Sequence, residues 1–220
     1  MSITFSISDS LKSILPNCRL GIITSEVIVK NSSSELLSKM SKIEDQYIQI
    51  LESTVESELE IIAETRQAYR VCGKKPSRYR PSAEALLRRL RLGKGLYKVN
   101  NIVDTINLMS ITSQYSIGGF NIANIENDVI LDIGDSNIYQ AIGRGPLNIE
   151  FMPGVKDTLG FFGTPTSDSE RTMVTRDIKH LALVYYDFFG NDKLMSSLES
   201  AKEFLSLYCE ASQITSEVVV

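Results

Sequence analysis

The sequence lacks the features that mark most membrane and secreted proteins. None of its apolar runs approaches the roughly 20 residues that a membrane span requires, and no basic residue precedes the apolar positions of residues 1–10, which argues against a secretory signal. Its three cysteines, Cys18, Cys72 and Cys209, are odd in number and far apart. This spacing predicts free thiols in a reducing compartment and no metal site. We therefore expect a cytoplasmic protein without a membrane partner.

Common catalytic signatures are missing as well. The sequence has no Walker loop, no GxGxxG, no HExxH and no GxSxG, so no cofactor is expected. The only histidine, His180, precedes a predicted strand, and we interpret it as a structural or surface residue because a catalytic histidine relies on positioned partners. Residues 143–146 (GRGP) could hold a phosphate, but an ordinary hairpin turn explains them better. Whether the chain is an enzyme stays open at this point.

What the sequence does contain is a very uneven distribution of charge. The net charge is −4, yet residues 66–98 hold eleven Lys or Arg residues and one acid, Glu84. Residues 31–65 show the reverse, with eight Asp or Glu residues and two Lys. Such polarity allows one face to attract a polyanion while the whole chain remains acidic.

The spacing of apolar residues predicts helices in the first half of the chain and strands in the second. A β-branched strand over residues 20–29 precedes amphipathic helices that start near residues 36, 58, 82 and 101. After residue 113, short alternating runs separated by Gly and Asn-Asp turns indicate β-structure, continuing through residues 172–174 and 181–186. We predict one α+β domain over residues 1–220, with mixed or antiparallel sheets packed against several helices. Its core covers about residues 20–189, and a C-terminal helix covers about residues 192–211.

The basic segment also contains tyrosines that suit RNA. Tyr69, Tyr79 and Tyr97 alternate with the cations, and aromatic rings beside cations can stack on unpaired bases along a phosphate backbone. The alternative is a solvated helix face whose leucines point to the core, and Arg66 and Arg70 could equally pair with the acidic helix before them. The residues that we predict to contact RNA are Lys74, Lys75, Arg78, Tyr79, Arg80, Arg88, Arg89 and Arg91.

Asn107 is a second candidate for a functional residue. It shares a helix face with Val103 and Ile111, which lie four residues on either side. A buried carboxamide must find hydrogen-bond partners, so Asn107 either ties loops together or points into a ligand pocket.

Three stretches are specific in combination: residues 73–89 (GKKPSRYRPSAEALLRR), 99–107 (VNNIVDTIN) and 169–175 (SERTMVT). Together they resemble free-standing forms of the B3/4 domain, which is known from the phenylalanyl-tRNA synthetase beta subunit. The resemblance covers roughly residues 20–189. It implies an α+β fold, and in the synthetase this domain holds an editing pocket that hydrolyses tRNA wrongly charged with tyrosine.

The resemblance also implies a substrate pocket, formed here by Asp104, Asn107, Gly118 and Gly119. Asn107 matches the family's pocket asparagine, whereas Ile106 replaces a threonine and Gly118 falls where the synthetase has a histidine. The two glycines should widen the mouth of the pocket and remove a polar side chain, which argues against the synthetase's way of discriminating tyrosine. No catalytic residue is assigned.

Two functions are consistent with these observations. The first is a tRNA-binding protein, with tRNA or aminoacyl-tRNA as its partner, that could act as a hydrolase removing the amino acid from mischarged tRNA in trans. The second is a non-catalytic module that binds a free amino acid or small metabolite in the former editing pocket. A third reading is an α+β protein with neither activity. The eleven cations favour tRNA, because a metabolite binder does not need them.

Overall fold

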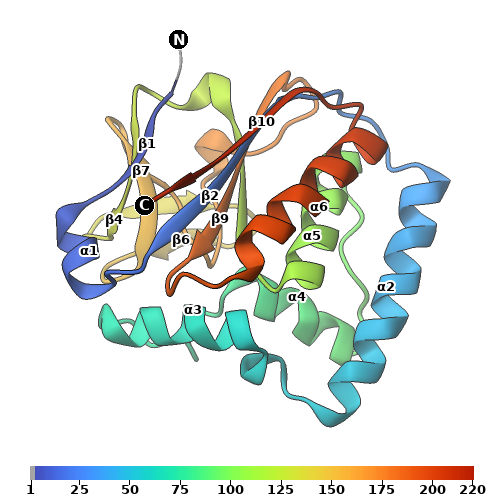
Figure 1. Cartoon of the computed structure of the whole chain (residues 1–220), viewed down its shortest axis with the longest axis horizontal. Coiled ribbons are helices and arrows are strands. Elements are labelled where there is room, and N and C mark those ends of the chain that lie inside the picture. Colours follow the sequence, from blue (N-terminus) through green and yellow to red (C-terminus); the bar gives the residue numbers. More distant parts are fainter. Residues whose placement is uncertain (1–2) are drawn as a thin grey trace.

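Two four-stranded sheets and one two-stranded sheet form the β-structure of residues 3–220, which are the residues described by the computed structural model (Figure 1). The first sheet is mixed, because β1 runs parallel to β4, and its order is β1 (Phe5–Ile7), β4 (Val129–Ile133), β7 (Pro153–Asp157) and β8 (Gly160–Gly163). The second is antiparallel, with the order β10 (Ser212–Val219), β2 (Arg19–Glu26), β9 (His180–Asp187) and β3 (Ile117–Asn121). A separate hairpin joins β5 (Ile138–Ala141) to β6 (Gly145–Asn148).

The helices gather in the first half of the chain and at its C-terminal side. They are α1 (Asp9–Ile14), α2 (Ser34–Ser53), α3 (Glu60–Val71), α4 (Ser82–Arg91), α5 (Asn101–Ser113) and α6 (Lys193–Tyr208). Side chains cap several of them: Ser33 Oγ accepts from Leu36 N at 3.1 Å, and Asn100 Oδ1 accepts from Val103 N at 2.9 Å. Helices and sheets of both kinds confirm the predicted α+β class.

The inner strand β9 of the second sheet is buried on both faces. Along β9, alternate residues point to opposite sides: Ala182, Val184 and Tyr186 join the buried cluster that also contains Val129 and Phe162 of the first sheet. Leu181, Leu183 and Tyr185 face the other way and pack with residues of α5 and α6. Figure 1 shows α5 and α6 lying along this face of the sheet. The continuous apolar character of β9 is the consequence of this double burial.

A third buried cluster connects α2, α3, α4 and α5. Its members include Leu86, Leu87 and Leu90, so the leucines of α4 do face the interior while the arginines between them stay at the surface. This arrangement confirms the amphipathic helix predicted for the basic segment and leaves its cations on the outer side of α4.

Some elements differ from the sequence-based expectations. The expected strand at residues 172–174 is absent; a 3-10 turn at Glu170–Thr172 replaces it, because Ser169 Oγ accepts from Arg171 N at 3.2 Å and closes the turn. The strands β1 and β10 have no counterpart among the predicted elements; β1 is an edge strand of three residues, and β10 is an edge strand that is largely exposed. Within residues 3–220, every helix is too short or too polar to span a bilayer. Cys18, Cys72 and Cys209 are free, as expected, and all three are buried.

Candidate nucleic-acid interface

A cavity of about 570 Å³ lies between α4, α5 and the turn that joins β5 to β6. Asn107 lines it from α5, and Arg89 lines it from α4. Apolar side chains form much of the remaining wall. The full lining consists of Arg80, Ser82, Ala85, Leu86, Arg89, Tyr97, Val99, Val103, Asn107, Ile142, Gly143, Arg144 and Thr166. This lining contains three arginines and no carboxylate.

The three arginines reach the cavity in different ways. Arg89 stacks on Tyr97, with its guanidinium carbon 3.7 Å from the ring centroid, and its Nε donates to Gly95 O at 3.1 Å. The Nε of Arg80 donates to Glu84 Oε1 at 3.2 Å. Arg144 is exposed on the β5–β6 turn and forms no ion pair with any residue of the described range 3–220. Planar guanidinium groups around one opening suit a phosphate or a carboxylate.

Asn107 contributes the amide group of this cavity. It is half-buried, and its side chain forms no hydrogen bond with residues 3–220, so its carboxamide keeps both donor and acceptor capacity for a bound molecule. Of the two roles left open for Asn107, the geometry places it at a pocket and does not make it a tie between loops.

The other three residues expected in the substrate pocket do not line this cavity. Asp104 is buried, and its two carboxylate oxygens accept from Ser32 Oγ at 2.6 Å and from Val99 N at 2.8 Å, so it holds the entry to α5 in place. Gly118 and Gly119 are buried in β3.

The expected widening of the pocket at these glycines is wrong. A Cβ atom on Gly118 would lie 2.4 Å from Phe120 Cζ, and one on Gly119 would lie 2.6 Å from Ile106 Cδ1. The Phe120 ring, which packs edge-to-face on Phe162 with centroids 4.9 Å apart, fills the space over Gly118 that was expected to be open.

Asp168 lies beside these glycines and was not identified from the sequence. Its Oδ2 accepts from Gly119 N at 3.1 Å, and burial raises the pKa of this carboxyl to about 8. No pattern in the sequence marks Asp168, because it is one acid in a loop and its burial comes from distant segments.

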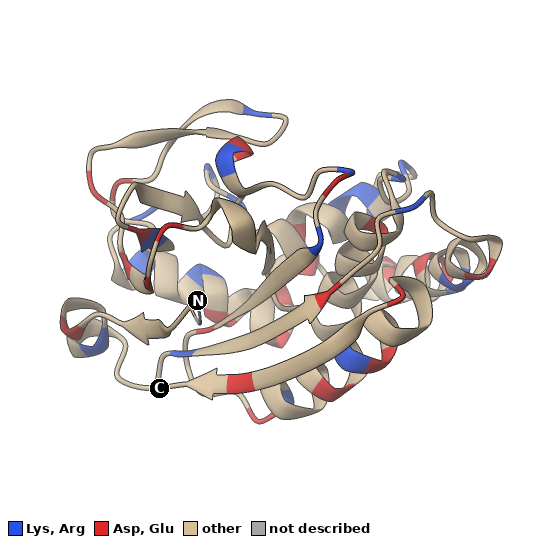
Figure 2. Cartoon of the chain, turned by 90° about the horizontal axis from the view of Figure 1, so that it is seen from above, with Lys and Arg blue, Asp and Glu red and all other residues tan. Residues whose placement is uncertain are grey.

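Two buried carboxylates organise the arginines of α3 and α4. Glu84 accepts from Arg66 Nη1 at 2.9 Å as well as from Arg80, and Glu56 accepts from Arg88 at 3.5 Å and from Arg91 at 3.0 Å. Figure 2 shows acidic and basic segments interspersed on the helical side of the molecule. Arg66 therefore forms its ion pair with Glu84 of α4. The alternative considered from the sequence was a pair with the acidic helix that precedes Arg66.

Lys74 was predicted to contact RNA, and its position contradicts this. Its side chain is buried, and Nζ donates to Asn148 O at 2.9 Å and to Glu150 O at 2.8 Å. Burial also lowers its pKa. Lys74 thus anchors the loop before α4 to the end of the β5–β6 hairpin. Its neighbours Lys75 and Arg78 are exposed, and Tyr79 packs partly against the hairpin.

A comparison with known protein families matches the part of the chain that contains the basic residues and most of the cavity lining. Residues 64–154 match the B3/4 domain, and this span contains every residue lining the cavity except Thr166. This segment is therefore similar to the B3/4 domain, and the match covers less than half of the 220 residues.

Among solved structures, the chain is similar to an N-terminal fragment of the phenylalanyl-tRNA synthetase beta subunit from Pyrococcus horikoshii, with 13% identity and a TM-score of 0.47. The similarity covers 100% of this chain and 51% of that one, so the chain spans about half the length of the fragment. No curated protein matches the chain.

Proposed function

We propose that this protein binds tRNA and that the cavity at Asn107 receives the 3′ acceptor end. One observation carries the proposal: a single cavity combines three guanidinium groups, an exposed tyrosine and a free carboxamide. Arg80 and Arg144 suit the phosphates of the terminal nucleotides. Tyr97, which is 52% exposed and already stacked with Arg89, suits an unpaired base.

The cavity also suits an amino acid attached to that end. Val99, Val103 and Ile142 supply an apolar wall for its side chain, and the Asn107 carboxamide can bond its amino or ester group. We propose hydrolysis of this ester as the activity: a water molecule held in the cavity attacks the ester carbonyl, the bond to the ribose oxygen breaks, and free amino acid and tRNA leave. Positioning by the substrate and by polar groups can drive such a reaction without a nucleophilic side chain.

A small anionic metabolite is the second candidate ligand. The cavity falls in the size range of small-molecule sites, and the same arginines would bind a carboxylate. The two candidate ligands, tRNA and a small metabolite, differ in how many cations of the protein they would contact. A tRNA would also engage the exposed cations outside the cavity, such as Lys75 and Arg78, whereas a metabolite would not.

Titration of fluorescently labelled tRNA at a series of salt concentrations tests the proposal. We expect the logarithm of the binding constant to fall steeply with the logarithm of salt concentration, because several phosphates are neutralised together. Arg144→Glu should weaken binding at least about tenfold. Arg176→Glu, which changes an exposed arginine outside the cavity, is the matched control. No binding of tRNA, or equal effects of the two variants, would refute the proposal.

Deacylation is tested separately with a panel of mischarged tRNAs. Asn107→Ala should slow the release of amino acid while leaving the charged surface unchanged. Binding of free amino acids by calorimetry, without any affinity for tRNA, would instead support the metabolite candidate.

A further inference from the structure

A second cavity, of about 430 Å³, lies between the C-terminal end of α3 and the turn that follows it. It shares no lining residue with the cavity at Asn107. Its lining consists of Arg66, Arg70, Gly73, Lys74, Lys75, Pro76 and Ser77. Four of these residues are cationic, and the lining described within residues 3–220 contains no carboxylate. The cavity therefore favours an anion.

The four cations differ in what they already bind. Arg66 Nη1 donates to both carboxylate oxygens of Glu84 at 2.9 Å, whereas its Nε and Nη2 form no hydrogen bond with residues 3–220. Lys74 Nζ donates to backbone carbonyl oxygens after β6. Arg70 and Lys75 are exposed and form no ion pair with residues 3–220. These two side chains supply positive charges that no carboxylate neutralises.

The helix spacing places two of the cations side by side. Arg66 and Arg70 are four residues apart on α3, so their side chains lie on the same face, and like charges at this spacing repel each other. No acidic residue stands three or four positions before or after Arg70. An anion in the cavity would offset this repulsion.

Backbone groups of the turn add hydrogen-bond donors. The turn is closed by Arg78 N, which donates to Lys75 O at 3.2 Å. The N–H groups of Lys75 and Ser77 and the Ser77 hydroxyl form no hydrogen bond with residues 3–220. The turn thus lines the cavity with unused donors as well as with the charge of Lys75.

The end of α3 does not cancel this preference. The C-terminal end of a helix dipole is negative and disfavours an anion because of its free carbonyl oxygens. Here Lys74 N donates to Tyr69 O at 2.7 Å, and Gly73 N donates to Arg70 O at 3.0 Å. These bonds occupy carbonyl oxygens of the last turn.

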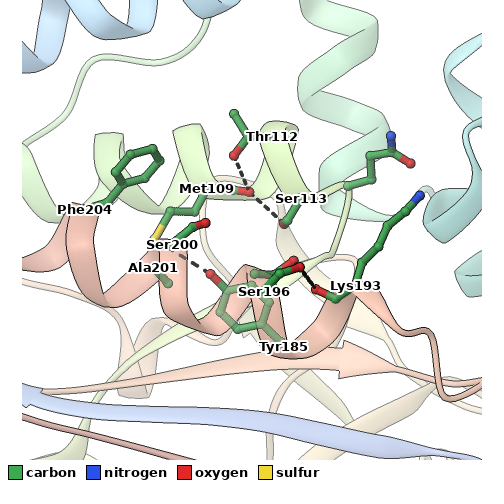
Figure 3. Close-up of a pocket in the computed structure, with 11 residues that line it drawn as sticks. Met109, Thr112, Ser113, Tyr185, Lys193, Ser196, Ser200, Ala201 and Phe204 are labelled. Carbon is green, nitrogen blue, oxygen red and sulfur yellow. Dashed lines mark hydrogen bonds between the residues drawn. The ribbon is translucent and has the colours of Figure 1, made fainter.

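A third cavity, of about 360 Å³ between α5 and α6, has a different character (Figure 3). Lys193 is the only charged residue of its described lining, and its ammonium group is paired with Glu60. Serine hydroxyls and apolar side chains form most of the remaining wall. Its lining selects no charge, in contrast to the lining of the cavity at Arg70.

We propose that the cavity at Arg70 and Lys75 binds the phosphate group of a phosphate monoester. Such a group carries a charge of about −1.5 to −2 at pH 7 and three strong acceptor oxygens. The charge matches the two cations that lack a carboxylate, and the oxygens match the unused donors of the turn. A carboxylate or a phosphodiester carries a single charge and matches less well. The site does not depend on the proposed binding of tRNA.

Three small anions separate these ligand classes: glycerol 1-phosphate, diethyl phosphate and acetate. We expect glycerol 1-phosphate to shift the backbone amide signals of Gly73, Lys75 and Ser77 in nitrogen–proton NMR spectra of the full chain, with saturation. Diethyl phosphate and acetate should bind several-fold more weakly, because each carries one charge. No saturable shift with glycerol 1-phosphate, or equal affinity for all three anions, overturns the proposal.

Charge reversal locates the binding. Arg70→Glu should weaken glycerol 1-phosphate several-fold, and the double variant Arg70→Glu/Lys75→Glu should abolish the shifts. Both positions are exposed, so the variants should fold. Arg176→Glu, at an exposed arginine outside the cavity, should leave the affinity unchanged. Wild-type affinity in the double variant, or an equal loss in Arg176→Glu, overturns the assignment.

The phosphate monoester can belong to a free phosphorylated compound or to the 5′ end of a tRNA. Titration of one tRNA with and without its 5′-phosphate distinguishes these sources. Tighter binding of the phosphorylated form, lost in Arg70→Glu, assigns the site to the tRNA end. Equal binding of the two forms, with the glycerol 1-phosphate shifts intact, assigns it to a free compound. If no tRNA binds, the proposed function fails while the NMR result for this cavity stands.

Discussion

Glu84 joins three segments through one buried carboxylate, so replacing it with glutamine should destabilise the fold. Arg66 Nη1 lies 2.9 Å from both carboxylate oxygens, and Arg80 Nε lies 3.2 Å from one of them. The Glu84 side chain is 5% exposed. Glu84→Gln keeps the shape of the side chain but removes the charge and places an amide donor against two guanidinium groups.

The cost follows from how far each arginine is buried. Removing one partner of a buried ion pair costs about 3–5 kcal/mol, because the other charge stays uncompensated. The side chains of Arg66 and Arg80 are 16% and 34% exposed, so water recovers part of this loss. We expect Glu84→Gln to lower the free energy of unfolding by about 2–4 kcal/mol, a large share of the stability of a typical domain.

Urea unfolding at pH 7, followed by circular dichroism, measures this change. Glu52→Gln is the matched control, since Glu52 is exposed on α2 and forms no ion pair within residues 3–220; its effect should stay below about 0.5 kcal/mol. If Glu84→Gln also falls within about 0.5 kcal/mol of the wild type, the carboxylate is not what holds the three segments together.

Three other changes have definite expected results. Asn107→Ala should alter the free energy of unfolding by less than about 0.5 kcal/mol, whereas Asn101→Ala should cost about 1–3 kcal/mol in the same urea experiment, because the Asn101 side chain bonds three backbone groups. Gly118→Ala should lower the Tm and cost about 1–3 kcal/mol, since the new Cβ would lie 2.4 Å from Phe120 Cζ; an unchanged Tm would contradict the packing. Asp168 has a pKa of about 8 when folded and an ordinary low value when unfolded, so the folded state retains a proton that the unfolded state loses. Wild-type stability should therefore fall between about pH 4 and pH 8 relative to Asp168→Asn, and parallel pH profiles would show that the carboxyl is not perturbed.

The sequence predicted the helices well because their signals are local. Ser33 and Asn100 cap their helices, and the leucines of α4 recur at the spacing of one buried face. The short strand β1 has no such local signal: its three residues, Phe5–Ile7, are held by pairing with residues 129–131 of β4, more than 120 residues away. No local pattern carries that information.

The residues of the candidate site also fall into two groups: those that the sequence could identify and those that only the tertiary structure brings to the cavity. Asn107, Arg80 and Arg89 could be singled out from sequence, and the structure brings all three to one cavity. Arg144 and Thr166 join them only because the β5–β6 hairpin and the segment after β8 fold against α4. The sequence also does not determine whether a lysine in a basic run, such as Lys74, is exposed, because exposure depends on the tertiary structure.

Gly118 shows a different limit. A glycine can mark open space or space that a neighbour fills, and these cases look identical in a sequence. Phe120, two residues along the same strand, covers Gly118 here, and only the orientation of its ring distinguishes the two.

The antiparallel sheet has a consequence for synthesis on the ribosome. Strand β2 lies between β9 and β10, and its residues 20–26 pair with residues 212–219 at one edge and with residues 180–186 at the other. Since a nascent chain emerges from its N-terminal side, β2 leaves the ribosome long before either partner exists. The backbone N–H and C=O groups of this apolar strand must stay without their β9 and β10 partners during translation of more than half of the chain, and such edges promote aggregation. This sheet can therefore be completed only after residues 212–219 have left the ribosome, and a chain released before β10 would expose the β2 edge to any other strand nearby.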